Sequence, residues 1–389
     1  MPAESRLTIW LPARTKYHRT RPVQRKHAKD TILHTTRKGG STTGTAKPGK
    51  DSAQHLHLIM NQSFRRCVGI DISKRKFTAC ISSRDGRERA PRDFHNDIAG
   101  FRDLCRWVGA TDGSLFLMEA TGVYHEPLAT WLHGAGLRVC VILPARAKRF
   151  AEAEGARTKT DASDSEMLSR LGIRMQQIPL WTPPDPLWRK IRTLTRMRSD
   201  ITRRDSGIRC HLEALSVRED ADATALYREM LAGGKRFLRS NEAAIRTLLH
   251  ARSGLKKRIA QLETIPGIGF LTAVTVLAET DAFRNTPSAR ALTCFAGLDV
   301  RQTQSGTSVH GRSRISKMGN AHLRAALYMP ALTAIRCSAH FRSIAEGISA
   351  RHPESRKIAV TAIQRRLLVV MFSLWKNGAE WRPAEAHPC

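Results

Sequence analysis

The sequence predicts an α/β domain that is followed by a long, mostly helical region. Short, β-branched apolar runs alternate with helical patterns between residues 67 and 172, and such alternation indicates an α/β layer structure. From about Leu187, Arg and Leu instead recur at helical spacing. The length of 389 residues suits two or three domains, and a hydrophobic share of 41% is enough for buried cores.

The α/β part divides into elements at recognisable boundaries. A strand that starts at Cys67, a turn at Ser73–Arg75 and a second strand open it. Two further buried strands are expected at 114–121 and 137–144, and Pro144 closes the second of them. Helices are expected at 124–136, stopped by Gly134 and Gly136, at 146–155, and at 160–172, capped by Thr160.

The helical part begins after a Pro-rich boundary at 178–186. One or two long helices are expected from Leu187 to Leu262, with a break at Gly233–Gly234, and they are consistent with a coiled-coil arm. A Ser-, Gly- and Arg-rich loop at 297–320 follows later, and two more helices complete the region.

Between these parts, "LETIPGIGFLTAVTVLAE" places Pro-Gly-Ile-Gly between two apolar helical stretches. The pattern is typical of a helix-hairpin-helix, with Gly267 and Gly269 in the turn. The exposed N–H groups of such a turn and the following helix N-terminus hold a phosphate. The alternative is a turn between two helices with a purely structural role.

The charge of the chain indicates a polyanionic partner. It holds 65 Lys and Arg against 34 Asp and Glu, a net charge of +31. Residues 181–389 hold 34 of these basic residues and 17 of the acidic ones, so the helical half has the larger electrostatic footprint. Nucleic acid is the first candidate for the partner.

Composition disfavours several classes of protein. No stretch approaches the ~18 consecutive apolar residues of a membrane span, and the basic N-terminus lacks an apolar signal segment. The eight cysteines show no Cys-x-x-Cys spacing and no paired histidine pattern, which disfavours zinc and a disulfide framework. We therefore expect reduced, mostly buried thiols in a cytoplasmic protein.

Residues 1–59 differ from the rest of the chain. They mix Lys, Arg, Thr, Gly and His without a lasting period, which is typical of a disordered basic extension. Structure is expected to begin at Met60. Two interpretations stay open: a tail that adds non-specific affinity, or an upstream extension that precedes a natural start at Met60.

Four acidic residues in three places carry the predicted chemistry. Asp71 lies in the first strand and Glu119 ends a later one, so neighbouring strands can place them side by side. Asp161 and Asp164 are three residues apart and share a helix face. Four carboxylates would repel one another without cations, and Mg²⁺ (or Mn²⁺) suits hard oxygen ligands. Taken singly, Asp164 could be a solvated surface residue and Glu119 a helix cap.

Long motifs in the chain resemble one family. The segments "GIDISKRKF", "MEATGVYHEPLATWLHGAG", "LPARAKRFAEAEGARTKTDASDSEMLSRL", "LETIPGIGFLTAVTVLAE", "ALTCFAGLDVRQTQSG" and "GRSRISKMGNAHLRAALY" strongly resemble the DEDD transposases of the Piv/MooV class, insertion-sequence family one-ten. The resemblance covers about residues 66–383.

The resemblance implies a RuvC-like domain with the RNase H fold over residues 60–180. Its DEDD metal site would consist of Asp71, Glu119, Asp161 and Asp164. Together with the helical pattern and the Pro-Gly-Ile-Gly turn described above, this predicts a helical coiled-coil linker at 181–262 and a C-terminal transposase domain, with the helix-hairpin-helix and a catalytic serine loop, at 263–389.

A nucleophilic serine is also implied by the resemblance. The matching residue is Ser305, within "QTQSG". Many relatives have a second serine before this Ser-Gly, where the chain has Gln304. For this reason Ser308, Ser313 and Ser316 remain weaker candidates, and an ordinary loop serine is the alternative for Ser305.

The family also suggests partners. Its members act on double-stranded donor and target DNA, are guided by a structured RNA, and build a composite site across the protomers of a dimer or tetramer. Arg312, Arg314, Lys317 and Asn320 would then hold DNA and RNA phosphates.

Three functions are compatible with these features. The first is a DNA transposase or recombinase that works through a phosphoserine intermediate. The second is a metal-dependent nuclease or Holliday-junction resolvase that uses the four acidic residues and water. The third is a non-catalytic DNA- or RNA-binding protein built on an inactive RNase H fold.

Overall fold

The computed structural model describes residues 58–60, 64–109, 111–120, 122–155, 160–302, 304–305, 309–310 and 314–383. All of them lie in the unit from Asp51 to Cys389. The predicted N-terminal extension therefore lies outside the described residues, except at its end. There, strand β1 (Leu58–Met60) starts two residues before the expected boundary and pairs with β7 (Gln177–Pro179).

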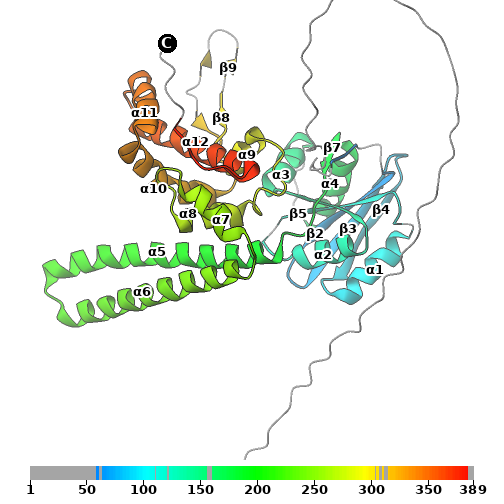
Figure 1. Cartoon of the computed structure of the whole chain (residues 1–389). Helices are drawn as coiled ribbons and strands as arrows, with labels where there is room; N and C mark the ends of the chain where they lie inside the picture. The colour runs from blue at the N-terminus through cyan, green and yellow to red at the C-terminus, as the bar shows by residue number, and fades with distance from the viewer. Residues whose placement is uncertain are drawn as a thin grey trace, which may run out of the picture. The chain divides into compact units, whose positions relative to one another are not determined.

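A five-stranded mixed sheet organises the N-terminal part (Figure 1). Its strands lie in the order β4-β3-β2-β5-β6. β2, β3 and β4 are antiparallel, whereas β5 runs parallel to both β2 and β6. The strands are β2 (Arg66–Ile72), β3 (Lys76–Ser83), β4 (Glu88–His95), β5 (Ser114–Glu119) and β6 (Arg138–Ile142). The expected α/β layering is confirmed.

Helices cover both faces of this sheet. Successive residues of a strand point to opposite faces, so each face forms its own core with the helices that cover it. Phe116 and Met118 of β5 pack in one core with the first two helices. Leu115 and Leu117 pack in a second core with the next two. In chain order, the helices are α1 (Ile98–Val108), α2 (Glu126–Gly134), α3 (Pro144–Ala153) and α4 (Asp161–Arg174).

Two local expectations need correction. Pro144 does not close a strand: β6 ends at Ile142 and Pro144 is the first residue of α3, where its missing N–H costs nothing. Strand β4 was not anticipated, because its sequence is charged and contains Pro91. It lies at the edge of the sheet, the one place where a strand tolerates proline and a row of exposed charges.

Two long helices, α5 (Pro186–Arg218) and α6 (Ala221–His250), lie side by side after the sheet (Figure 1). The predicted break at Gly233–Gly234 is wrong, since both residues lie inside α6. The chain reverses at Glu219 instead, which has a left-handed φ of 52°. A Cβ on Gly234 would lie 2.4 Å from Asp205 Oδ2, so this glycine permits close approach of the two helices. Coiled-coil geometry stays a prediction.

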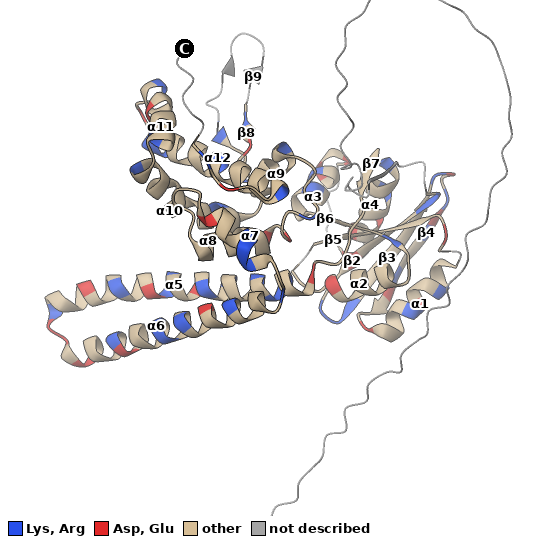
Figure 2. Cartoon of the chain, viewed as in Figure 1, with Lys and Arg blue, Asp and Glu red and all other residues tan. Residues whose placement is uncertain are grey.

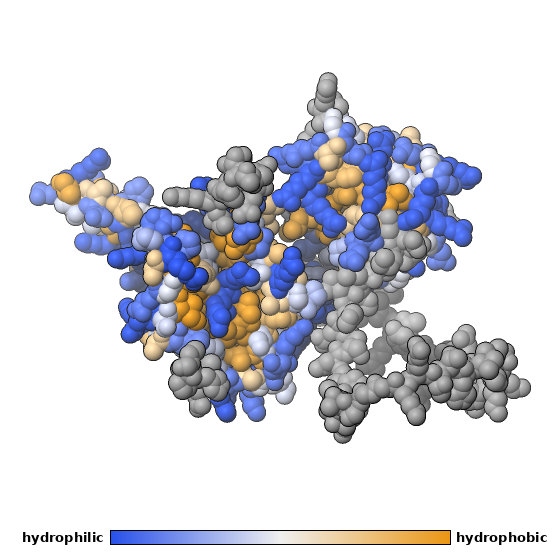
Figure 3. Space-filling view, turned by 90° about the horizontal axis from the view of Figure 1, so that it is seen from above, coloured by the Kyte–Doolittle hydropathy of each residue, from blue (hydrophilic) through white to orange (hydrophobic). Residues whose placement is uncertain are grey.

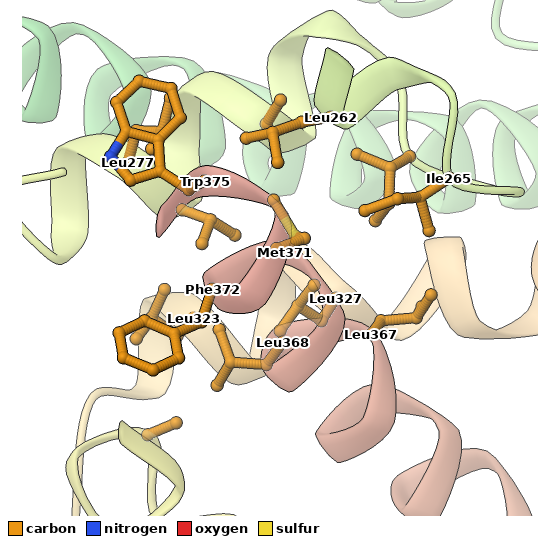
Figure 4. Packing of buried hydrophobic residues seen from close by; sticks show 14 of the residues in the cluster. Leu262, Ile265, Leu277, Leu323, Leu327, Leu367, Leu368, Met371, Phe372 and Trp375 are labelled. Carbon is orange, nitrogen blue, oxygen red and sulfur yellow. The ribbon is translucent and has the colours of Figure 1, made fainter. Parts of the chain in front are cut away.

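The C-terminal part is helical and packs around one large core, to which α5 and α6 also contribute. Apolar residues of several helices meet there, among them Leu262, Leu277, Leu327 and Leu367 (Figure 4). The helices are α7 (Leu255–Glu263), α8 (Phe270–Glu279), α9 (Ala289–Ala296), α10 (Ala321–Cys337), α11 (Ala339–Arg351) and α12 (Arg356–Asn377).

Helix α12 is long and apolar enough to cross a membrane, but half of its most apolar stretch is buried inside the protein. Met371 and Phe372 of this helix lie in the C-terminal core (Figure 4). Its apolar character is therefore explained by packing. On the face drawn in Figure 3, hydrophilic residues alternate with smaller apolar patches.

The loop expected at 297–320 contains four short strands that the sequence did not indicate. They pair as two small antiparallel ladders, β8 with β11 and β9 with β10. Their bounds are β8 (Val300–Arg301), β9 (Gln304–Ser305), β10 (Val309–His310) and β11 (Arg314–Ile315).

Candidate catalytic and nucleic-acid sites

Asp71 and Glu119 lie at the same end of two neighbouring strands. Asp71 is the penultimate residue of β2 and Glu119 is the last residue of β5. The strands are parallel, and their register pairs Ile70 with Met118. The next residues along the two strands are Asp71 and Glu119, so they follow at the same level, with their strands about 5 Å apart.

Both acidic side chains belong to the face of the sheet that α4 covers. Cys67 and Leu117 point to that face, because they pack in the core that contains residues of α4. Asp71 is four residues after Cys67, and Glu119 is two residues after Leu117. Since the side-chain period of a strand is two, the carboxylates project from the same face.

Helix α4 lies directly on β2. A Cβ on Gly69 would lie 2.1 Å from Ser169 N and 2.3 Å from Ser165 O, and a Cβ on Gly172 would lie 2.2 Å from Cys67 Sγ. The C-terminal end of α4 therefore lies over Cys67, and its middle lies over Gly69. One helical turn further toward its N-terminus, the first turn of α4 is directed toward the end of β2 that contains Asp71.

Asp161 and Asp164 lie in that first turn. Thr160 caps the helix as predicted: its Oγ1 accepts from Ser163 N, and Ser163 Oγ accepts from Thr160 N, which completes a capping box. Lys76 Nζ lies 3.2 Å from Asp161 Oδ2 and 3.2 Å from Asp93 Oδ2. The hydrogen bond to Asp93 and, to a smaller extent, the one to Asp161 raise the pKa of Lys76. Lys76 begins β3, so the pair links α4 to the turn after β2.

The fold thus places Asp71 and Glu119 at one end of one sheet face and directs the first turn of α4, which contains Asp161 and Asp164, toward that end. Asp71, Glu119 and Asp164 each interact with other groups of the chain. Across the described ranges, no three His, Cys, Asp or Glu side chains are grouped closely enough to hold a metal ion. The segment that leads into α4, residues 156–159, is not among those ranges. A metal site formed by these acids therefore stays a prediction.

The predicted serine lies in a short hairpin. Ser305 belongs to β9 and is the register partner of Val309 in β10. Of the weaker candidates, Ser308 and Ser313 lie outside the described residues, as does Arg312. Ser316 is described, and its hydroxyl donates to Asp299 Oδ1.

The predicted phosphate-binding turn joins α7 and α8. Gly267 has a φ of +86°, and a Cβ on it would lie 2.4 Å from the carbonyl oxygen of Pro330 in α10. Glycine is therefore required at position 267 by its close packing against α10. Gly269 is the N-cap of α8, is exposed, and has no atom within 4 Å of where a Cβ would lie. This helix N-terminus is open, as phosphate binding requires.

The remaining predicted nucleic-acid residues have different surroundings. Arg314 and Lys317 are exposed. Asn320 caps α10 by accepting from His322 N and Leu323 N, and it donates to Glu279 at 2.7 Å. Its side chain is therefore committed to internal hydrogen bonds.

The comparisons with known proteins cover both parts of the chain. A model of DEDD transposases of the IS110 type, described as a transposase, matches residues 68–215. A model described as transposase IS116/IS110/IS902 family matches residues 259–346. A pilin gene-inverting protein of Moraxella bovis is 30% identical over 316 residues, which are 80% of this chain and 96% of the relative. The chain belongs to the IS110-type transposase family.

Other relatives agree with this assignment. A pilin gene-inverting protein of Moraxella lacunata is also 30% identical over 316 residues, 80% of this chain and 96% of the relative. A probable family 20 transposase of Pseudomonas aeruginosa is 24% identical over 352 residues, 81% of this chain and 98% of the relative. This transposase is therefore an enzyme that acts on DNA.

Sequence reasoning missed Asn96, which joins two loops of the transposase. Its Nδ2 donates to Ser73 O at 3.0 Å and to Tyr124 O at 3.2 Å. These carbonyls belong to the segments that follow β2 and β5, the strands that bear Asp71 and Glu119. The residue directly follows β4, and because that strand was not anticipated, no local signal indicated the contact.

His125 was likewise missed. It is 8% exposed, and its Nδ1 has no hydrogen-bond partner within the described part of the chain. Burial lowers the pKa of His125, although the Glu126 charge and a hydrogen bond to the backbone of Gly122 oppose the shift. The imidazole of His125 is therefore neutral near pH 7.

Glu279 is the third residue that was not singled out. Its carboxylate is buried, with Oε1 2.8 Å from Arg196 Nε and Oε2 2.8 Å from Arg196 Nη2. Burial acts to raise the pKa of Glu279, but hydrogen bonds from Arg196 and Asn320 outweigh it and hold the pKa below its ordinary value. The trio links α5, α8 and the start of α10 in the transposase.

Proposed function

We propose that this transposase exchanges DNA strands by metal-assisted attack of a serine hydroxyl on phosphorus. The packing of α4 on β2 at Gly69 carries the proposal, because it directs the first turn of α4 to the strand end that bears Asp71. The proposed metal ligands are Asp71, Glu119, Asp161 and Asp164, and the proposed nucleophile is Ser305.

The donor set fits a hard divalent cation. All four ligands are carboxylates, which match the oxygen preference of Mg²⁺ and Mn²⁺ better than that of zinc or copper. When bound, such a cation would polarise the scissile phosphate and offset the charge that develops on it. Lys76 lies beside Asp161 and supplies positive charge at the same place.

The serine step conserves the phosphodiester energy. Ser305 Oγ loses its proton and forms a bond to phosphorus, while the bond from phosphorus to one deoxyribose oxygen breaks and that oxygen takes up a proton. A serine hydroxyl is a weak nucleophile near neutral pH, so it needs an adjacent base. In the second step, a deoxyribose hydroxyl of another DNA strand attacks the phosphoserine and loses its proton, while the bond from phosphorus to Ser305 Oγ breaks and Oγ takes up a proton. The two DNA strands are thereby joined without hydrolysis.

Nucleic acid binding completes the proposal. Donor and target DNA, and a guide RNA, would be held by the excess positive charge of the helical half. The serine lies 234 residues after Asp71 in the sequence, and we propose that a dimer or tetramer completes the site across protomers. The proposed phosphate contacts are Gly267, Gly269, Arg312, Arg314 and Lys317; Asn320, predicted from the sequence, is left out because its amide is held by Glu279 and by the start of α10.

The test combines a donor plasmid, a target plasmid and the non-coding RNA that flanks the element. Wild-type protein should recombine the plasmids with the RNA present, and denaturation during the reaction should trap a covalent protein–DNA adduct. Ser305→Ala should abolish adduct and product, whereas Ser308→Ala, which replaces one of the weaker candidate serines, should retain both. Asp71→Asn should abolish cleavage.

Each alternative predicts a different outcome. A nuclease or resolvase would still cut DNA as the Ser305→Ala variant and would leave no adduct. A non-catalytic binding protein would show the same cellular effects as the wild type when it carries Asp71→Asn. Recombination without added RNA would remove the guide RNA from the proposal and leave the serine chemistry intact.

A further inference from the structure

Two arginines face each other at the base of the hairpin that carries Ser305. In the β8–β11 ladder, Arg301 is the register partner of Arg314. Directly opposed residues have Cβ atoms about 4.5–5.5 Å apart on one face, and like charges in this position are destabilising. Both arginines are exposed, and neither has a carboxylate at ion-pair distance among the described residues. Figure 2 shows the basic colour of β8 at the hairpin base.

The surroundings of this pair add positive charge and a hollow. A cavity of about 440 Å³ is lined by Arg301 together with Arg149 of α3, and by the apolar side chains of Val300 and Met318. Asp299 also lines it, but one of its carboxylate oxygens accepts the hydroxyl hydrogen of a neighbouring serine.

Lys317, two residues beyond β11, adds a further positive charge beside this cavity. Its side chain is exposed, and its backbone has a left-handed φ of 53°. A lysine in this conformation carries a backbone strain that only the surrounding contacts maintain.

The base of the hairpin is braced by close backbone contacts. A Cβ on Gly319 would lie 2.3 Å from Phe295 O. Asn320 N donates to the same carbonyl at 2.7 Å, and Lys317 N donates to Gly297 O at 3.1 Å. The two ends of the loop are therefore fixed to each other, and the opposed arginines are presented on a rigid support.

We propose that Arg301 and Arg314 together grip one phosphate of the DNA strand that is being cut, with Lys317 and Arg149 on the adjoining phosphates. A phosphate between the guanidinium groups would turn their repulsion into two charge-assisted contacts. Ser305 is four positions after Arg301, so their Cα atoms are at most about 14 Å apart. The gripped phosphate therefore lies near the scissile one.

This position relative to the cut rests on the proposed role of Ser305, but the binding does not, so the test is done in the Ser305→Ala background. The affinity for a fluorescent DNA duplex from the element end is measured from 50 to 300 mM salt, in about five steps. Each lost phosphate contact should weaken binding and lower the salt slope by about 1. Arg301→Gln and Arg314→Gln should each show this effect. Arg102→Gln, an exposed arginine of α1, is the matched control.

Arg301→Glu separates a binding defect from a folding defect. The new carboxylate would face Arg314 and form a cross-strand ion pair, so the melting temperature should stay the same or rise while DNA binding falls further than in Arg301→Gln. Wild-type affinity and salt slope in Arg301→Glu would overturn the proposal. It would equally be overturned if the substitutions weakened binding of the flanking RNA and left DNA binding unchanged.

Discussion

Replacing Gly69 with alanine perturbs the packing that directs the acidic residues to one place. The new methyl carbon would lie 2.1 Å from Ser169 N and 2.3 Å from Ser165 O. Both are backbone atoms of α4, so no side chain can turn aside. Favourable contact requires about 3.5 Å or more, and α4 must therefore move away from β2 by more than ~1 Å.

The structure gives the expected size of the effect. Overpacking a well-packed interior costs about 1–3 kcal/mol of unfolding free energy. The first turn of α4 would move with the helix, and Asp161 and Asp164 with it. A misplacement of about 1 Å at a catalytic site can cost ~100-fold in rate. We expect Gly69→Ala to remain folded at 25 °C and to lose about two orders of magnitude in recombination rate.

The assay compares plasmid recombination and urea unfolding of the same preparations. Gly207→Ala is the matched control: it lies inside α5, and no atom lies within 4 Å of its new methyl carbon. It should keep full activity and gain up to ~1 kcal/mol from helix propensity. Unchanged stability and activity in Gly69→Ala would refute the packing argument. Lost stability with a normal rate per folded molecule would show that the place of α4 does not govern catalysis.

Three further predictions concern stability. Gly267→Ala should lower the free energy of unfolding by about 2–4 kcal/mol, because the strain of a left-handed φ and a clash with a backbone carbonyl add together. Urea unfolding measures the loss, and a loss no larger than that of Gly269→Ala would contradict this. Glu279→Gln should cost about 1–3 kcal/mol, while Glu242→Gln, which weakens a more exposed arginine pair, should change stability by less than ~0.5 kcal/mol; equal costs would argue against the buried trio. The pKa of His125 is lowered by burial in the folded state, so as pH falls below ~6.5 the unfolded state takes up the proton first and the wild type loses stability. Thermal melts of His125→Gln between pH 7 and 5 should show a smaller loss, and parallel melts would count against the assignment.

Local patterns predicted much of the N-terminal part. The apolar run at 114–121 and the capping signal at Thr160 gave correct elements, because strand burial and helix capping depend on near neighbours in sequence. Pro144 and Gly233–Gly234 were misread, since proline starts helices as well as ending strands, and Gly234 lies inside α6 where it allows close packing against α5. The distinction requires the partner element, which local sequence does not supply.

The sequence by itself determined the chemistry that this chain offers. Composition and local periodicity predict a large excess of positive charge and place four of the acidic residues in the order strand, strand, helix. The role of the serine in the loop rests on the resemblance of its motif to the family.

Only the tertiary structure decided which of these groups can meet. Parallel pairing of β2 with β5 sets Asp71 level with Glu119, and the absence of a side chain at Gly69 lets α4 lie directly on β2. The β8–β11 ladder likewise opposes Arg301 and Arg314, which are thirteen positions apart in the chain. Strand register and helix contact are set by the packing of distant segments, and for that reason they appeared in no local pattern.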